Sequence, residues 1–243
     1  MCSSDLKSFA ILKLAELWQE LHPKGNIYVI DVETGLAKTF KSAFQNVKNI
    51  KIWHGADVDT ADKFLLVFEE LIKLVTPEDF LCIESDTRIW DACQDMGWLR
   101  VTGRSKDEYM THRLAAGAGA VVPHPDQLWQ VVLDLYRRRF RDVLVNQVRM
   151  KTNILITTGL SKSSPRVSPS RQTSMKLLGI DVQPDGHAEN VRNPDTVVML
   201  SRDSEGYWAE VLKDRGSDKP GQIVRFQVRN GFLFDFTVAC RGK

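Results

Sequence analysis

The sequence predicts an α/β protein that contains a mostly parallel sheet, with antiparallel strands toward its C-terminal end. Through residues 9–158, amphipathic helical patterns alternate with short apolar runs, which is the arrangement of crossover units around a parallel sheet. Two of these runs, 27–33 and 80–83, are apolar until the carboxylates that close the first and follow the second, as is typical of parallel strands buried on both faces. After Asp195, short apolar runs are separated by turn residues, and this spacing predicts antiparallel strands added to the edge of the sheet.

The individual elements follow from the spacing of apolar residues and from the turn residues between them. From Phe9 to Leu21 the apolar positions fall on one helical face, and Pro23 with Gly25 ends this helix. Residues 159–176, rich in Ser, Pro, Arg and Lys, are expected to form a long mobile loop. Further helices are expected at 60–75 and 128–148, and strands at 27–33, 49–53, 80–83, 153–158, 196–200, 207–212, 223–228 and 232–236.

Composition excludes several classes of protein. With 43% hydrophobic and 26% charged residues, the 243-residue chain has the composition of a globular domain, not of a disordered or fibrous protein. The net charge of +2 excludes a basic coat over the whole surface, and no apolar run approaches the roughly 20 residues of a membrane span. The four cysteines are scattered without a CxxC pair, so neither a zinc site nor a disulfide framework is expected, and a reducing cytoplasm fits.

Acidic residues follow two of the expected parallel strands. Asp31 and Glu33 close the first, and Glu84 and Asp86 follow the run 80–83. In an open α/β sheet, ligands bind outside the carboxyl ends of the strands. One carboxylate there can hold Mg²⁺ through water, and another can orient or deprotonate an attacking water. Taken singly, each pair is explained as well or better by helix caps or turn acids.

The start of the chain favours the interpretation of these acids as a functional site. Lys7 and Ser8 are expected to open a helix that lies ahead of the first acid-tipped strand. A Walker A loop has the pattern G-x-x-x-x-G-K-S/T followed by a helix. Residues 1–6 supply neither its glycines nor the strand before them, so we expect these residues to be a foreign remnant joined to a truncated reading frame. Residues 7–243 are then expected to form one domain whose first strand is missing.

Several further segments of the chain agree with one protein family. The residues Ile30–Glu33 are similar to a second strand carrying a water-activating glutamate, and Phe80–Ser85 to a Walker B strand. The residues Asn153–Thr158 resemble a strand that carries a γ-phosphate sensor, and the most specific likeness lies in 183–186 and 194–215. On these segments the chain resembles the RecA-like P-loop ATPases, most closely the phage-encoded nucleotide-binding proteins of DNA recombination and annealing.

The resemblance implies a role for each residue at the matching positions, with ATP and Mg²⁺ as cofactors. It departs from the pattern at Glu84, which stands where Walker B normally has the shorter Asp, so that Asp86 is the alternative metal ligand. Two basic residues near the end of the chain would reach the nucleotide of a neighbouring subunit in a ring or filament, as an arginine finger does. The implied roles are phosphate binding for Lys7, Mg²⁺ binding for Ser8, Glu84 and Asp86, water orientation for Glu33, γ-phosphate sensing for Thr157, and action across a subunit interface for Lys213 and Arg215.

The basic loop 159–176 is a candidate for contact with single-stranded DNA. It carries four basic residues and no acid, and in RecA-like recombinases the loop at this place contacts DNA. Because it lacks aromatic residues, its contacts would be electrostatic and salt-sensitive. The alternative is an ordinary surface loop, and the separate arginine run 137–141 is expected to be a solvated helix face. The four basic residues of the loop are Lys162, Arg166, Arg171 and Lys176.

The expected function is ATP binding and hydrolysis coupled to single-stranded DNA in phage recombination or annealing, in the cytoplasm of the host. Without a glycine loop, two or three hydrogen bonds to phosphate are lost, which costs about 4 kcal/mol or roughly a thousandfold in affinity. We therefore expect a weak or inactive ATPase. The alternatives are a replicative helicase or helicase loader, a non-enzymatic DNA-binding scaffold, and a PIN-like nuclease in which Asp31, Asp57, Asp59 and Asp86 would surround a metal.

Overall fold

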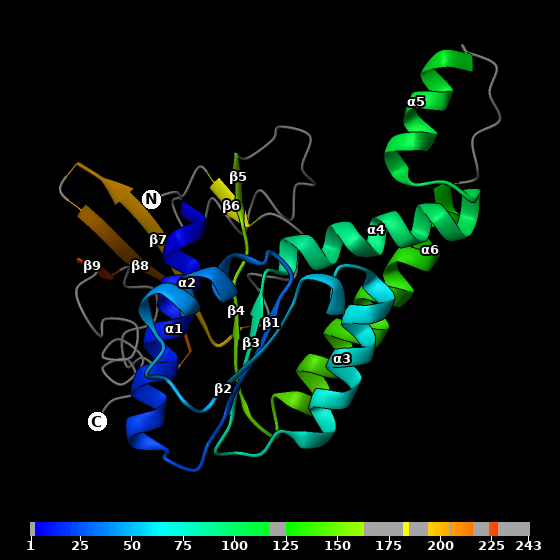
Figure 1. Ribbon diagram of the computed structural model, residues 1–243. Coiled ribbons are helices and arrows are strands. Elements are labelled where there is room, and N and C mark those ends of the chain that lie inside the picture. The colour runs from blue at the N-terminus through cyan, green and yellow to red at the C-terminus, as the bar shows by residue number, and fades with distance from the viewer. Residues whose placement is uncertain are drawn as a thin grey trace. The chain divides into compact units, whose positions relative to one another are not determined.

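The structure, a computed structural model, shows an α/β protein (Figure 1). Its residues cluster into two compact units, between which the chain passes more than once. The first unit comprises 1–27, 34–51 and 157–243, and the second comprises 28–33 and 52–156. The residues that the structure describes are 3–116, 125–162, 182–184, 194–204, 206–215 and 224–227.

The second unit is built on a four-stranded parallel sheet, and this confirms the predicted class of fold. The strands lie in the order β2-β1-β3-β4, so the two apolar runs that the sequence placed in the interior are central neighbours. Strands β3 and β4 run parallel, with Phe80 opposite Asn153 and Ile83 opposite Ile156. That the core is RecA-like stays a prediction. The strands are β1 (Ile27–Asp31), β2 (Ile50–His54), β3 (Phe80–Glu84) and β4 (Asn153–Ile156).

Burial separates the central strands from the outer ones. Every residue of β1 is buried, and so are all residues of β3 after Phe80, as expected for strands covered on both faces. The outer strands β2 and β4 have no buried residue. Beyond the ends of the central pair, the amide of Val32 donates to the carbonyl of Glu84 at 2.5 Å. The pairing of β1 with β3 therefore continues into the segments that carry the acidic residues.

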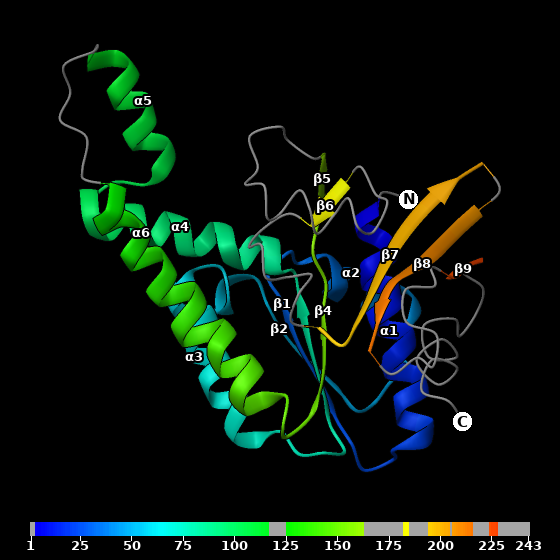
Figure 2. The same cartoon turned by 180° about the vertical axis from the view of Figure 1, so that it is seen from behind.

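The helices of the second unit include two that the sequence analysis did not predict. Figures 1 and 2 show α4 and α6 side by side, with α5 at the end of this pair that lies away from the sheet. Neither α4 nor α5 was predicted. The expected helix 60–75 is confirmed as α3, and the expected helix 128–148 as α6 with its π-helical continuations. The elements are η1 (Gly55–Asp57), α3 (Ala61–Leu74), α4 (Asp86–Thr102), α5 (Lys106–Ala116), α6 (Pro125–Leu133), η2 (Asp134–Arg141) and η3 (Leu144–Val148).

An aromatic cluster forms the centre of the core between α3 and η2. The ring of Phe140 packs edge-on against Phe64 at 5.1 Å and against Phe68 at 5.2 Å between centroids. Tyr136, one helical turn before Phe140, packs edge-on against Trp90 of α4 at 4.8 Å. Such aromatic pairs add to the free energy already gained by burying the rings. The cluster therefore fixes η2 against both α3 and α4.

Helix α4 approaches α6 closely at a glycine. A Cβ atom at Gly97 would lie 2.5 Å from Cγ2 of Val132, a stiff β-branched side chain in α6. We expect Gly97→Ala to lower the free energy of unfolding by about 1 kcal/mol, because overpacking of 1–3 kcal/mol outweighs a helix-propensity gain of about 1 kcal/mol. Urea denaturation measures this change. In a Val132→Ala background the clash is gone, so the same substitution should stabilise; destabilisation there as well would contradict the packing argument.

The first unit contains α1, α2 and two antiparallel sheets. Helix α1 ends at Leu21 as predicted, but it begins at Ser3 and not at Lys7. The predicted C-terminal strands are antiparallel, yet they pair in a sheet of their own, because β7 and β8 form a local hairpin. The expected strand 232–236 lies outside the described residues. The elements are α1 (Ser3–Leu21), α2 (Gly35–Ala43), β5 (Leu160–Lys162), β6 (Val182–Pro184), β7 (Thr196–Asp203), β8 (Gly206–Asp214) and β9 (Val224–Gln227).

Candidate functional site

The carboxyl ends of β1 and β3 bring acidic side chains to one edge of the sheet. Asp31 is the last residue of β1, Glu84 is the last residue of β3, and both are fully or almost fully buried. Glu33 and Asp86 follow two residues later in each case, so the four acids lie where the sequence analysis expected them. Because buried carboxylates are costly unless compensated, their concentration at this edge needs a positive charge or hydrogen-bond donors nearby.

A serine hydroxyl joins the two strand ends. Ser85 is fully buried, and its Oγ donates to Oε1 of Glu33 at 2.5 Å. The peptide bond between Glu84 and Ser85 is cis. The hydrogen bond from Ser85 restrains the carboxylate of Glu33. Glu33 is the one acid at this edge that is only partly buried, and the sequence analysis gave it the role of orienting water.

Asp86 has two buried partners in η2. The Tyr136 hydroxyl donates to Asp86 Oδ2 at 2.6 Å, and Arg141 Nη1 lies 3.8 Å from Asp86 Oδ1. Burial, followed by the negative charge of Asp86, raises the pKa of the Tyr136 hydroxyl well above its usual value, so it remains a donor. Asp86 thus fastens the first turn of α4 to η2. Its role as a metal ligand stays a prediction, and in this arrangement its carboxylate already serves two neighbours.

The arginine run in η2 is largely paired within the chain. The expectation of a solvated face is wrong for Arg141, which is buried beside Asp86. The other three arginines are at least partly exposed but lie near acids, so their charges are partly neutralised. The pairs are Arg137 with Asp142 at 4.0 Å, Arg138 with Asp134 at 3.1 Å, and Arg139 with Glu69 at 2.7 Å.

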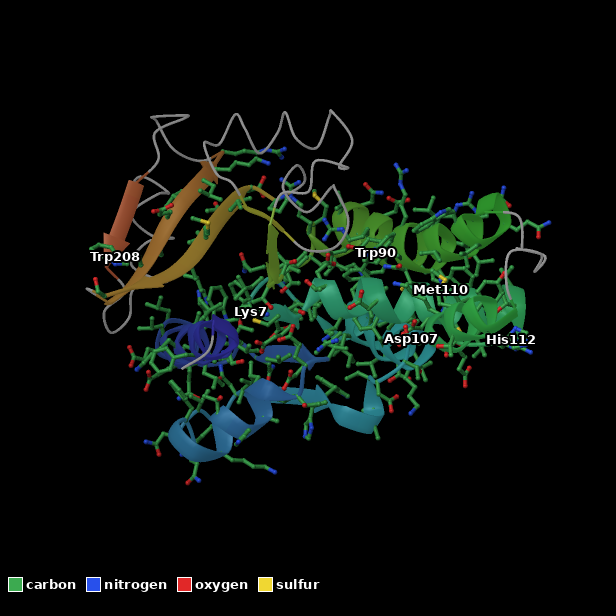
Figure 3. All side chains as sticks on the ribbon, turned by 90° about the horizontal axis from the view of Figure 1, so that it is seen from above. Lys7, Trp90, Asp107, Met110, His112 and Trp208 are labelled. Atoms are coloured by element: carbon green, nitrogen blue, oxygen red, sulfur yellow. The ribbon has the colours of Figure 1, made fainter. Side chains whose placement is uncertain are left out.

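Lys7 and Ser8 lie within α1 in the first unit, and Figure 3 labels Lys7 there. Ser8 is buried beside the start of α2, since a Cβ atom at Gly35 would lie 3.6 Å from Ser8 Oγ. The backbone N–H groups that a helix leaves open for phosphate are those of its first four residues. Residues 3–6 already belong to α1, so Lys7 and Ser8 lie beyond the first four residues of the helix. The expectation that Lys7 and Ser8 open the helix is therefore wrong.

The remaining candidate residues lie in the first unit. Thr157 follows β4 directly and is partly buried. Lys213 lies in β8 opposite Val197 of β7. Arg215 follows β8, and its Nη1 lies 3.4 Å from Oδ1 of Asp195, with both side chains about half exposed. Lys162 ends β5, whereas Arg166, Arg171 and Lys176 lie outside the described residues.

The metal chemistry of the described residues is limited. Among them no group of three or more His, Cys, Asp or Glu side chains is placed to hold a metal ion. Asp57 and Asp59 are exposed, and Asp59 forms an ion pair with Lys63 at 2.8 Å, which argues against the nuclease hypothesis. Mg²⁺ bound with a nucleotide needs only one or two protein oxygens besides phosphates and water. The donor chemistry of Glu84 fits that smaller requirement.

The buried residues around Asp86 were the ones that sequence reasoning missed. Tyr136 and Arg141 are five positions apart, a spacing that brings residues to one side of a π-helix but not of an α-helix. Trp90, labelled in Figure 3, covers Tyr136 and stacks on Trp129 at 6.1 Å between ring centroids. The sequence signal for Arg141 was weak, because it stands in a run of arginines and is distinguished only by the adjacent Phe140.

No protein-family model and no curated protein matches this chain. Within the part of the chain that the structure describes, no helix is both long enough and apolar enough to cross a membrane.

Proposed function

We propose that this chain is an ATP-binding and ATP-hydrolysing protein that acts on single-stranded DNA in phage recombination or annealing, with weak activity in its present form. One observation carries the proposal. Acidic residues follow two adjacent central strands at their carboxyl ends, and Glu33 among them is held by the hydroxyl of Ser85. A partly exposed carboxylate held at this edge of a parallel sheet is suited to orienting a water for attack on a phosphate.

Each residue would act through its own chemistry. Glu33 would orient the attacking water, and Lys7 would bind the β- and γ-phosphates as a point charge. In the second unit Glu84 would hold Mg²⁺, which when bound neutralises phosphate charge, and in the first unit Ser8 offers a hydroxyl of the kind that binds Mg²⁺ beside a nucleotide. Thr157 would sense the γ-phosphate through its hydroxyl.

The start of α1 supports the expectation of weak activity. Phosphate binding at a helix N-terminus uses the open amides of the first turn. Here Lys7 lies beyond that turn, so its side chain and the open amides are separated along the helix. Among the described residues of α1, Lys7 offers a cation and Ser8 a hydroxyl for the nucleotide.

DNA and a second subunit would meet other parts of the chain. Lys162 and the basic residues after it would bind the phosphate backbone of DNA, and such binding weakens with salt. Lys213 and Arg215 would reach the nucleotide of a neighbouring subunit in a homo-oligomeric ring or filament. For Arg215 this requires its exposed ion pair with Asp195 to open, a change that costs little for a surface pair. A phage protein of this kind would act in the host cytoplasm.

The test is ATP hydrolysis by two proteins, with and without single-stranded DNA. One is the chain itself, and the other, called here the loop-restored chain, carries a strand and a Gly-rich loop in place of residues 1–6. We expect DNA-stimulated hydrolysis by the loop-restored chain and an at least tenfold loss in its Lys7→Ala variant, because Lys7 contacts the phosphates.

Lys13→Ala is the matched control, because Lys13 lies in the same helix and contacts Glu16 at 2.6 Å and the ring of Phe44. Absence of nucleotide binding by the loop-restored chain would overturn the proposed function.

A non-enzymatic DNA-binding scaffold is the second candidate, and the position of Lys7 beyond the first turn of α1 favours it. Salt-sensitive DNA binding that ATP does not change in either protein would support the scaffold. Unwinding of a forked duplex would instead assign the chain to helicases or their loaders.

A further inference from the structure

We propose that Ser85 is a positioning residue for Glu33, which it holds in the orientation needed to direct a water toward the nucleotide. This inference rests on the proposed function. It extends that function to a residue that acts through Glu33 and not on substrate or metal, because the hydroxyl of the fully buried Ser85 is given to the Glu33 carboxylate.

The contact itself is short and spans two strands. Ser85 Oγ donates to Glu33 Oε1 at 2.5 Å, across 52 residues of sequence. An ionised carboxylate only accepts hydrogen bonds, so a hydroxyl donor favours one orientation of the group. A hydrogen bond to a charged acceptor is stronger than one between neutral groups. The hydroxyl therefore fixes the direction in which the carboxylate of Glu33 is presented.

The backbone around Glu33 is restrained on both sides. Before it, the amide of Val32 is bonded to the carbonyl of Glu84. After it, Thr34 has a φ of 60°, a left-handed conformation that is unusual for a β-branched residue and turns the chain sharply. Such conformations persist where the surrounding structure determines them. With its backbone held, Glu33 retains only its side-chain torsions, and these are what Ser85 restrains.

Removal of the hydroxyl should therefore lower turnover and leave substrate binding unchanged. We expect Ser85→Ala to reduce kcat for ATP hydrolysis by about 10- to 100-fold, a part of the 10²- to 10⁴-fold that a positioned acid–base group contributes. KM should stay within about twofold, because no contact with substrate is lost.

A double-mutant cycle in the loop-restored chain distinguishes positioning from a general structural effect. In a Glu33→Ala background, Ser85→Ala should lower kcat no further, because the group that Ser85 orients is already absent. The matched control is Thr152→Val. Thr152 is also buried and donates to the carbonyl of Asp79 at 2.6 Å, but both residues precede their strands at the opposite edge of the sheet. This control should leave kcat unchanged.

The two single variants, Ser85→Ala and Glu33→Ala, and their double variant also test the contact in the unaltered chain, where no enzymatic activity is needed. Ser85→Ala and Glu33→Ala should shift the urea midpoint non-additively, because both remove the same hydrogen bond. Additive shifts, or an equal loss of kcat from Ser85→Ala with and without Glu33, would overturn the inference.

A failure of the proposed function can be distinguished from a failure of the positioning role of Ser85. If Glu33→Ala hydrolyses ATP normally, the role of Glu33 fails, and the positioning role of Ser85 fails with it. If neither protein hydrolyses ATP, the function and the positioning role both fall, while non-additive urea midpoints would still establish the contact.

Discussion

Replacement of Asp86 by Ala should lower the free energy of unfolding by about 3–5 kcal/mol, because it leaves the buried guanidinium of Arg141 without its carboxylate. The Tyr136 hydroxyl loses its buried acceptor in the same substitution. Urea denaturation followed by circular dichroism measures the change. Because Asp86 is the first residue of α4, the loss also releases the first turn of that helix from η2.

An exposed pair in the same segment is the control. Arg138→Met removes the ion pair with Asp134, whose side chains are 78% and 49% exposed, so stability should change by less than about 1 kcal/mol. The double variant Asp86→Leu with Arg141→Met should recover most of the loss, because it removes both buried charges together. If Asp86→Ala costs no more than Arg138→Met, the buried pair does not hold α4 to η2.

The central sheet could be predicted because its strands are buried on both faces. Burial on both faces leaves an unbroken apolar run, as in β1 and β3, and such a run is visible without any knowledge of its neighbours. Helix α4 left no such signal. Its buried positions include Asp86 and Gly97, so it packs through a polar network and a close backbone approach, not through an apolar stripe.

The candidate site likewise contains features that the sequence could predict and features that it could not. The meeting of Glu33 with Glu84 follows from topology alone, because adjacent parallel strands end at one edge. The bond from Ser85 to Glu33, and the contacts of Tyr136 with Asp86, join residues at least 50 positions apart, and no local pattern encodes them. The early start of α1 did have a local signal. Its sequence Ser3-Ser4-Asp5 is typical of a helix cap and first turn, and the comparison with a Walker loop overlooked it.

The loop-restored chain should bind a fluorescent ATP analogue with Mg²⁺ about a thousandfold more tightly than the unaltered chain. A Gly-rich loop ending at Lys7 would move the helix start to that residue, and the loop amides would add two or three hydrogen bonds to phosphate. At 1.5–3 kcal/mol for each bond to a charged group, the gain is about 4 kcal/mol, which corresponds to that ratio of dissociation constants. Fluorescence titration of both proteins measures it.

The control is a loop of the same length in which alanine replaces each glycine. Glycine is needed where a chain adopts positive φ values and where its backbone must approach a ligand closely, so the alanine loop should restore little of the affinity. Equal binding by the two loops would mean that added length alone creates the site. Equal binding by the unaltered and the loop-restored chain would mean that the phosphates are held elsewhere than at Lys7. The first result would revise only the role of the glycines. The second would mean that a nucleotide used by the acidic edge of the sheet is not bound at the start of α1.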